Sequence, residues 1–312
     1  MAIRLFIDGA AGTTGLEIRE RLQGRSEFDL IVLDDAQRKD ESARRDALHA
    51  ADITILCLPD EAAMSAVRLA NGAATRIIDA SSVHRVAEGW TYGFPEIIGH
   101  EKIANAKLVS NPGCYPTGFL ALVAPLVRDG LLSADWPYTV NAVSGYSGGG
   151  NALIDRFATE PDIAFRAYGL LGGHKHLPEM KAYAGLTHQP VFSPSVVPTH
   201  RGMIVDVPLP LAALPGQPRC KALHAALCAH YEGSSIVTLA PLAPIPSELL
   251  LLKSAAPWDG LTLHIYGSAD GTQARLVAHL DNLGKGASGA AIQNLNIMCG
   301  LPETTGLRLG SA

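Results

Sequence analysis

Short runs of apolar residues alternate with amphipathic segments over the first third of the chain. The apolar runs predict buried strands at 3–8, 29–33, 53–57, 76–79 and 107–110, and the amphipathic segments predict helices near 15–23, 38–49 and 61–71. This alternation is typical of parallel strands that are joined by helices. We therefore predict an α/β fold with a Rossmann-type, doubly wound parallel sheet that is covered on both faces.

After residue 114 the pattern changes, and strand-like runs dominate. They lie at 138–143, 191–198, 202–207, 236–240, 261–268 and 273–280, with helical segments near 150–160, 218–230 and 290–299. This pattern predicts an α+β domain whose sheet is mostly antiparallel and carries its helices on one face. The last dozen residues have no pattern of their own and are expected to be loose.

Composition excludes several classes of protein. The chain has 312 residues, 47% of them hydrophobic and 18% charged, with a net charge of −5. A net negative charge gives no general attraction for nucleic acid or for an anionic membrane. No apolar run approaches the ~20 residues that a membrane span needs. Five cysteines without paired spacing argue against a disulfide framework. We therefore expect a cytoplasmic protein with neither a nucleic acid nor a membrane partner.

The most informative residue is Cys114, in the run 110–118, SNPGCYPTG. Proline is tolerated in the first turn of a helix, so Pro116 predicts a helix start just after the cysteine. A thiol at such a position lies at the positive end of the helix dipole, which favours the nucleophilic thiolate. Cys114 is therefore predicted to be a catalytic nucleophile; the alternative is a structural cysteine in a loop.

A glycine turn joins the first predicted strand to the first predicted helix. The turn 9–15, GAAGTTG, stands where glycines let the backbone approach a pyrophosphate at a helix N-terminus. Its spacing is G-x-x-G-x-x-G, which leaves the identity of the nucleotide open. Asp34 and Asp35 lie where an acid would reach the adenosine ribose, whereas Arg38 and Lys39 could instead hold a 2′-phosphate.

Two histidines follow a double glycine in the run 172–179, GGHKHLPE, before a helix that begins with proline. His174 and His176 are candidates for acid–base chemistry, and Glu179 could hold one imidazole in the useful tautomer. Metal binding by both histidines and a surface location are the alternatives. Cys220, His224 and Cys228 share a helical spacing, but with no fourth ligand in sequence we interpret them as packing residues, and we expect no metal.

Three further segments present polar groups between predicted elements. Arg85 follows a strand end at the edge where ligands bind to doubly wound sheets; a surface arginine is the alternative. Ser144 opens the run 144–150, SGYSGGG, which offers hydroxyls and amides to an anion but could equally be a flexible connection. Arg201 is an isolated cation between two strands.

These segments together resemble the short form of N-acetyl-γ-glutamyl-phosphate reductase, in the aspartate-semialdehyde dehydrogenase superfamily. The resemblance covers nearly the whole chain and is carried by GAAGTTG, ASSVHR, SNPGCYPTG, HKHLPE, THRGM and the terminal NLGKGASGAAIQNLNIMCG. It implies an NADP-binding Rossmann domain over 1–114, completed by the C-terminal helix 284–312. It also implies an α+β catalytic and oligomerisation domain over 115–283, in a homo-oligomer, dimer or tetramer.

The resemblance also implies roles for individual residues. Cys114 would be the nucleophile, His174 the acid–base and Glu179 its supporting carboxylate. Phosphate and carboxylate groups of the substrate would meet Arg85, Asn111, Ser144 and Arg201. The cofactor would be NADP, bound by Gly9, Gly12, Thr13, Thr14, Gly15, Arg38, Lys39, Ser81, Asn282 and Gly286.

The implied reaction is the reduction of a small acyl phosphate to an aldehyde through a thioester on Cys114, as a step of arginine biosynthesis. Aspartate-semialdehyde dehydrogenase, which has the same chemistry on a shorter substrate, remains an alternative. A nucleotide-binding sensor that has lost catalysis is the other alternative. The acids at Asp34 and Asp35 depart from what a 2′-phosphate site would favour, so NAD also stays open.

Overall fold

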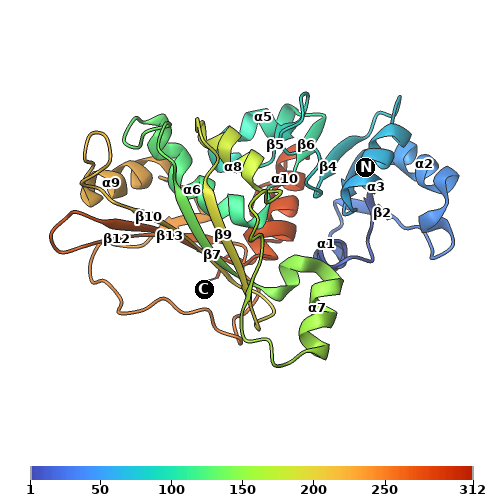
Figure 1. The fold of residues 1–312 in the computed structure, drawn as a ribbon. Helices are drawn as coiled ribbons and strands as arrows, with labels where there is room; N and C mark the ends of the chain where they lie inside the picture. Colours follow the sequence, from blue (N-terminus) through green and yellow to red (C-terminus); the bar gives the residue numbers. More distant parts are fainter. Residues whose placement is uncertain (1, 311–312) are drawn as a thin grey trace. The chain divides into compact units, whose positions relative to one another are not determined.

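The computed structural model describes residues 2–310, and the chain divides into two compact units (Figure 1). Residues up to Pro112, together with Ala287–Leu307, form unit 1. Gly113–Gly286, together with the residues from Arg308 on, form unit 2. The C-terminal segment therefore belongs partly to each unit.

Unit 1 is built on a six-stranded sheet in the order β2-β1-β3-β4-β6-β5, in which all neighbouring strands are parallel. The strands are β1 (Ile3–Asp8), β2 (Phe28–Ile31), β3 (Ile53–Leu56), β4 (Arg76–Asp79), β5 (Thr91–Tyr92) and β6 (Leu108–Ser110). The predicted doubly wound sheet is confirmed; the two-residue strand β5 gave no apolar run long enough to detect. The strand order reverses between β1 and β3, where such sheets form a ligand crevice.

Helices cover both faces of this sheet, as the sequence predicted. They are α1 (Thr13–Leu22), α2 (Glu41–Ala50), α3 (Asp60–Leu69), α4 (Pro95–Ile98), α5 (His100–Asn105) and α10 (Gly289–Met298), with a short 3-10 turn at Gln37–Lys39. Residues of α1, α5 and α10 share one apolar cluster with the strands, and residues of α2 and α3 share another. The short helices α4 and α5 were not predicted, because four to six residues show no helical period.

Helix α10 is buried along its whole length, although it carries three side-chain amides (Figure 1, red). Each amide donates hydrogen bonds to partners in unit 1. Gln293 donates to Glu96 and Glu303, Asn296 to the carbonyls of Glu303 and Thr305, and Asn294 to the Gly93 carbonyl (2.9 Å) and the Asn111 Oδ1 (3.1 Å). Buried polar groups with such partners specify one docked position.

The segment after α10 is ordered by hydrogen bonds as far as the structure describes it, so the expectation of a loose tail is wrong up to Arg308. Arg25 donates to the Thr305 carbonyl (3.3 Å). The Asp259 N–H donates to the Arg308 carbonyl (2.9 Å), and the Arg308 N–H donates to the Asp259 carboxylate (2.7 Å). These partners lie far away in sequence, which is why the local pattern did not reveal them.

Unit 2 holds a seven-stranded sheet in the order β11-β12-β13-β10-β7-β9-β8. Its strands are β7 (Thr139–Gly145), β8 (Arg166–Ala167), β9 (Val191–Val197), β10 (Met203–Leu209), β11 (Val237–Leu239), β12 (Leu261–Gly267) and β13 (Ala274–Leu280). Four of the six neighbouring pairs are antiparallel, as predicted, and β7–β9 and β11–β12 are parallel. The sheet is therefore mixed.

The helices of unit 2 are α6 (Cys114–Arg128), α7 (Gly150–Thr159), α8 (Leu177–Ala184) and α9 (Cys220–His230), with a helical turn at Tyr146–Gly149. A further helical turn, Gly284–Ser288, begins in unit 2 and ends in unit 1. Helix α6 packs on β10 and β13, and α8 and α9 pack against α6. A Cβ atom at Gly118 would lie 2.7 Å from Val205 Cγ2, so the absence of a side chain there lets α6 approach the sheet.

We expect Asn294→Asp to destabilise unit 1, because the carboxyl keeps the shape of the amide but removes its N–H donors. The loss should be about 1–3 kcal/mol or more near pH 7. Burial raises the pKa of the introduced carboxyl above its unfolded value, so the loss should be smallest near pH ~4 and grow as pH rises. Denaturant unfolding at several pH values measures it; Asn105→Asp, at an exposed position, is the control. Equal losses for both variants would contradict the role of the buried amide.

Candidate functional site

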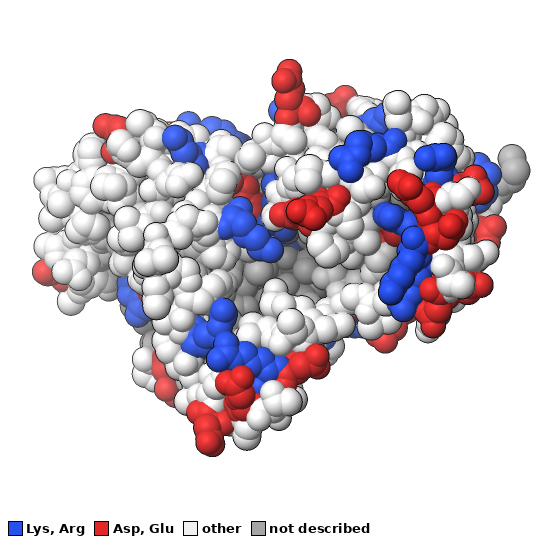
Figure 2. Space-filling view, turned by 45° about the vertical axis from the view of Figure 1, so that its right-hand side comes forward, with Lys and Arg blue, Asp and Glu red and all other residues white. Residues whose placement is uncertain are grey.

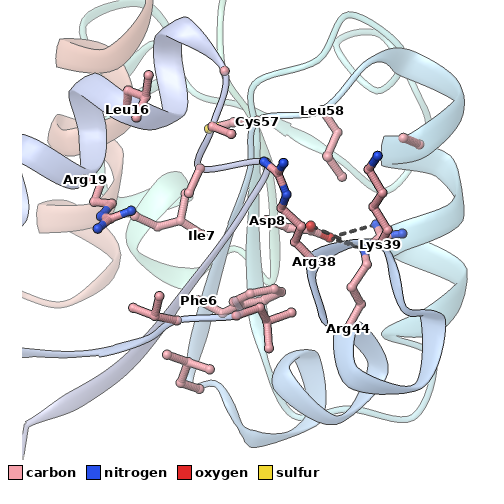
Figure 3. A pocket seen from close by; sticks show the side chains of 18 of the residues that line it. Phe6, Ile7, Asp8, Leu16, Arg19, Arg38, Lys39, Arg44, Cys57 and Leu58 are labelled. Atoms are coloured by element: carbon pink, nitrogen blue, oxygen red, sulfur yellow. Dashed lines mark hydrogen bonds and ion pairs between the residues drawn. The ribbon is translucent and has the colours of Figure 1, made fainter. Parts of the chain in front are cut away.

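Unit 1 holds a pocket of about 680 Å³ at the reversal point of its sheet (Figure 3). The glycine turn, the ends of β1 and β3 and the Gln37–Lys39 turn line it. Gly9 has φ +90°, and a Cβ there would lie 2.3 Å from the Cys57 carbonyl oxygen. A Cβ at Gly15 would lie 2.4 Å from the Gly9 carbonyl oxygen. Both glycines are therefore required by close backbone packing at this turn.

The predicted cofactor residues of unit 1 divide into two groups. Gly9, Gly12, Arg38 and Lys39 line the pocket, as does Asp8. Thr13, Thr14 and Gly15 form the first turn of α1 and are not among the residues that line the pocket. Ser81 lies after β4, where its hydroxyl donates to the buried Asp79 carboxylate (2.6 Å).

The two acids after β2 have different surroundings. The Asp34 carboxylate accepts the N–H groups of Ala36 (2.9 Å) and Gln37 (2.8 Å), so it caps the turn that carries Arg38. Asp35 lines the pocket, but its side chain is 92% exposed and lies 3.2 Å from the Arg38 guanidinium. Asp34, the acid nearer β2, therefore uses its carboxylate as an acceptor for the backbone N–H groups of its own turn.

Arg85 and Asn111, two predicted substrate residues, also lie in unit 1. The Arg85 Nε donates to the Asn111 carbonyl (3.1 Å), and Arg85 is buried. The Asn111 amide donates to the Ala287 carbonyl (3.0 Å) and accepts from Asn294. Asn111 is thus part of the network that holds α10, and its substrate role remains a prediction.

In unit 2, Cys114 is the first residue of α6. The helix begins two residues before the predicted start at Pro116, which places the half-buried thiol in the first turn itself. A Cβ at Gly286 would lie 2.9 Å from Cys114 Cβ, so only glycine lets the turn at Gly284–Ser288 pass so close to the cysteine. This contact gives Gly286 a packing role; its predicted cofactor contact remains a prediction.

Glu179 lies in the first turn of α8 and is 1% exposed. Its carboxylate accepts the N–H of Gly113, the residue before Cys114 (3.1 Å). Burial, followed by the charge of Glu179, raises the pKa of the neighbouring Tyr183 to about 12. The contact ties α8 to the start of α6, a link that the sequence did not suggest.

The two histidines lie beside the residue that follows Cys114. The ring centroids of His174 and His176 are 4.7 Å apart and lie 6.0 and 5.8 Å from the Tyr115 ring. The backbone N–H of His176 donates to His174 Nδ1 (3.2 Å). Because Nδ1 accepts, the neutral His174 imidazole carries its proton on Nε2.

Two tyrosines that sequence reasoning missed complete this cluster. Tyr168 donates to the Tyr115 hydroxyl (3.3 Å), which in turn donates to the Ser195 carbonyl (3.1 Å). Burial raises the pKa of Tyr168 to about 12; the hydrogen bond with Tyr115 lowers this pKa, and the interaction with Cys114 raises it, by smaller amounts. Burial, with Tyr168 and Cys114 as further causes, also raises the pKa of Tyr115. Tyr115 could have been suspected from its place beside Cys114, but no local signal marks Tyr168.

The remaining predicted residues of unit 2 gather around the glycine-rich run. Gly148 lies close to two of them: a Cβ atom built at Gly148 would be 3.5 Å from Ser144 Oγ and 3.4 Å from Asn282 Nδ2. Asn282 donates to the Ser147 hydroxyl (2.9 Å). Arg201 donates to the Asp281 carboxylate (2.7 Å), and this pair is largely buried. The structure therefore brings Ser144 and Asn282 together beside the Asp281–Arg201 pair.

Other binding chemistries gain no support from the described residues 2–310. Basic and acidic side chains lie beside one another on the face in Figure 2, and broad areas carry neither. No group of three or more potential metal ligands is found in this part of the chain, and none of its helices has the length and apolar character of a membrane span.

Two family models match the chain. Residues 34–106 match the semialdehyde dehydrogenase NAD binding domain, and residues 114–282 match the semialdehyde dehydrogenase dimerisation domain. Solved structures share the fold: aspartate semialdehyde dehydrogenase II from Vibrio cholerae superposes with a TM-score of 0.70 at 18% identity, over 96% of this chain and 99% of the other.

Curated relatives are much more similar in sequence. N-acetyl-gamma-glutamyl-phosphate reductase 2 of Nostoc sp. is 47% identical, over 97% of this chain and 99% of the relative. N-acetyl-gamma-glutamyl-phosphate reductase of Brucella ovis is 49% identical, over 96% of this chain and 100% of the relative. The chain therefore belongs to the semialdehyde dehydrogenase family of oxidoreductases and, within it, to the N-acetyl-γ-glutamyl-phosphate reductases.

Proposed function

We propose that the protein reduces N-acetyl-γ-glutamyl phosphate to N-acetylglutamate 5-semialdehyde with NADPH and releases phosphate, a step of arginine biosynthesis. The observation that carries the proposal is the surroundings of Cys114. It opens α6, Glu179 holds the preceding amide, and the histidine and tyrosine cluster lies beside it. The names of the relatives at 47–49% identity support the same substrate.

In this mechanism the Cys114 thiolate attacks the acyl carbonyl, and phosphate leaves as a stable anion, which produces a thioester. When bound, the nicotinamide cofactor supplies the hydride for reduction. The Cys114 N–H at the helix start and the His174 Nε2–H are the donors available to the developing oxyanion. His174 gives its Nε2 proton to this oxyanion, and it takes the same proton back when the thiohemiacetal collapses to the aldehyde and releases the Cys114 thiolate. Glu179 acts here by holding the Gly113 amide, which fixes the start of α6.

We assign the unit 1 pocket to NADP. Its glycine turn fits a pyrophosphate, because the backbone is bare at Gly9 and Gly12. The Asp34 carboxylate is engaged in its own turn, which weakens the argument for a ribose-binding acid and hence for NAD. Arg38 and Lys39 would hold the 2′-phosphate, since both line the pocket and point along it from one short turn (Figure 3).

Residues 1–114 with the C-terminal helix would form the cofactor domain, and 115–283 the catalytic and oligomerisation domain, in a homo-oligomer. The seven-stranded sheet of unit 2 lies within the segment that matches a dimerisation domain. The remaining predicted contacts, Arg85, Ser144 and Arg201 with substrate and Ser81, Asn282 and Gly286 with cofactor, belong to the same proposal. A cytoplasmic location is in keeping with five free cysteines.

Cys114→Ser should abolish turnover while it leaves NADP binding nearly unchanged, because a hydroxyl is a far weaker nucleophile near neutrality. The wild type, given acyl phosphate without nucleotide, should release about one phosphate per active site and carry an acyl group on Cys114, as seen by mass spectrometry. Cys228→Ser, at an exposed cysteine of α9, is the matched control and should behave as wild type. Substantial turnover by Cys114→Ser would contradict the covalent mechanism.

The substrate is tested separately, by comparing the rates of the wild type with N-acetyl-γ-glutamyl phosphate and with aspartyl phosphate. A preference for aspartyl phosphate would indicate an aspartate-semialdehyde dehydrogenase instead.

His174→Asn should slow the reaction by roughly 10²–10⁴-fold, the usual range for a positioned acid–base group. His176→Asn should lose much less, because the backbone N–H that sets the His174 tautomer remains and asparagine is a good helix N-cap. Steady-state rates over a pH series, with and without chelator, measure both variants. The opposite order of losses would assign the acid–base role to His176, and inhibition of the wild type by chelator would indicate a metal site.

Reversing the charge at both Arg38 and Lys39 to glutamate should weaken NADP far more than NAD, because only NADP carries the 2′-phosphate. Dissociation constants of both cofactors, measured by calorimetry on the same protein, make NAD the internal control. Equal losses for the two cofactors would mean that the pair is structural and that the NADP assignment is wrong.

A further inference from the structure

One carboxylate of the unit 1 pocket, that of Asp8, carries a negative charge that would repel an anionic ligand. Asp8 ends β1, directly before Gly9 of the glycine turn, and lines the pocket. It is 4% exposed, so water screens its charge poorly. A phosphate group that approached the neighbouring amides would meet an unfavourable like charge.

Arg44 of α2 forms an ion pair with the Asp8 carboxylate. Its Nε lies 3.1 Å and its Nη2 2.8 Å from Asp8 Oδ2, so the guanidinium meets the carboxylate through two adjacent donors (Figure 3, dashed lines). The side chains of Arg44 and Asp8 are 13% and 5% exposed. A pair so little exposed stays associated at ordinary salt concentrations.

The other cations of the pocket are placed differently. Lys39 has no ion pair among the described residues, and Arg38 faces only the exposed Asp35. Arg38 and Lys39 are therefore available to a ligand, whereas Arg44 has both of its contacting nitrogens on Asp8. In Figure 3 the Arg38 and Lys39 side chains extend away from the point where Arg44 meets Asp8.

We propose that Arg44 is a positioning residue for the dinucleotide: it holds Asp8 in a neutral ion pair, so that the pyrophosphate common to NAD and NADP can approach the glycine turn. This inference rests on the proposed dinucleotide function of the pocket. It assigns to Arg44 a role distinct from that of Arg38 and Lys39, because the pyrophosphate is present in both cofactors and the 2′-phosphate in only one.

The test is the affinity of Arg44→Met for NADP⁺ and NAD⁺, measured by calorimetry. We expect both to weaken by the same factor, about tenfold or more, because the variant leaves a buried carboxylate without its partner. The double variant Asp8→Asn, Arg44→Met should recover both affinities to within about threefold, since it removes the repelling charge. Arg45→Met removes a cation from an exposed position of the same helix and should change neither affinity.

Each other outcome overturns the inference. A loss confined to NADP would make Arg44 a 2′-phosphate ligand, and an unchanged affinity would make the ion pair irrelevant to binding. Failure of the double variant to recover would leave Arg44 with a purely structural role. If Arg44→Met does not fold, Asp8→Asn alone decides: both affinities should hold or rise, and a fall in either contradicts the proposal. Failure of the proposed function is distinct, because the wild type itself would then bind neither dinucleotide.

Discussion

The burial of helix α10 is the constraint on which unit 1 depends. A helix buried on every side is stable only if its polar groups find partners, and its three amides find theirs on α4, on the Gly93 carbonyl, on Asn111 and on the segment that follows the helix. One of these bonds joins Asn294 to Asn111, which directly follows β6 in the run that contains Cys114. The C-terminal segment therefore completes the core of unit 1 and also fixes the chain just ahead of Cys114.

In unit 2 the main constraint is the placement of one thiol at the start of a helix. Three close contacts determine that start: the sheet below Gly118, the turn that passes at Gly286, and the carboxylate of Glu179 on the Gly113 amide. Glycine is needed at two of these points because any side chain would fill the space that the approach requires. In the cluster of His174, Tyr115 and Tyr168, a hydrogen bond to Nδ1 selects the tautomer of His174, and burial raises the pKa of Tyr168.

The unit 1 pocket shows how charge is distributed locally in a protein that is negative overall. Four cations and two carboxylates line it, a local excess of positive charge that the net value conceals. The buried pair of Asp8 and Arg44 is neutral as a unit, whereas the cations of the 3-10 turn are exposed. The local charge of this pocket therefore differs from the net charge of the chain.

The sequence by itself determined the order and type of most elements and the family to which the chain belongs, because apolar period, glycine turns and the SNPGCYPTG and HKHLPE motifs are local signals. Only the tertiary structure decided which partners those residues meet. Glu179 contacts Gly113, 66 residues away in sequence, because α8 packs on α6. The Asp34 carboxylate accepts the N–H groups of the turn that follows it. Tyr168 reaches the Tyr115 hydroxyl from a loop that contains no recognisable motif. Such contacts depend on which elements pack together, and the spacing of residues along one segment does not give its partner.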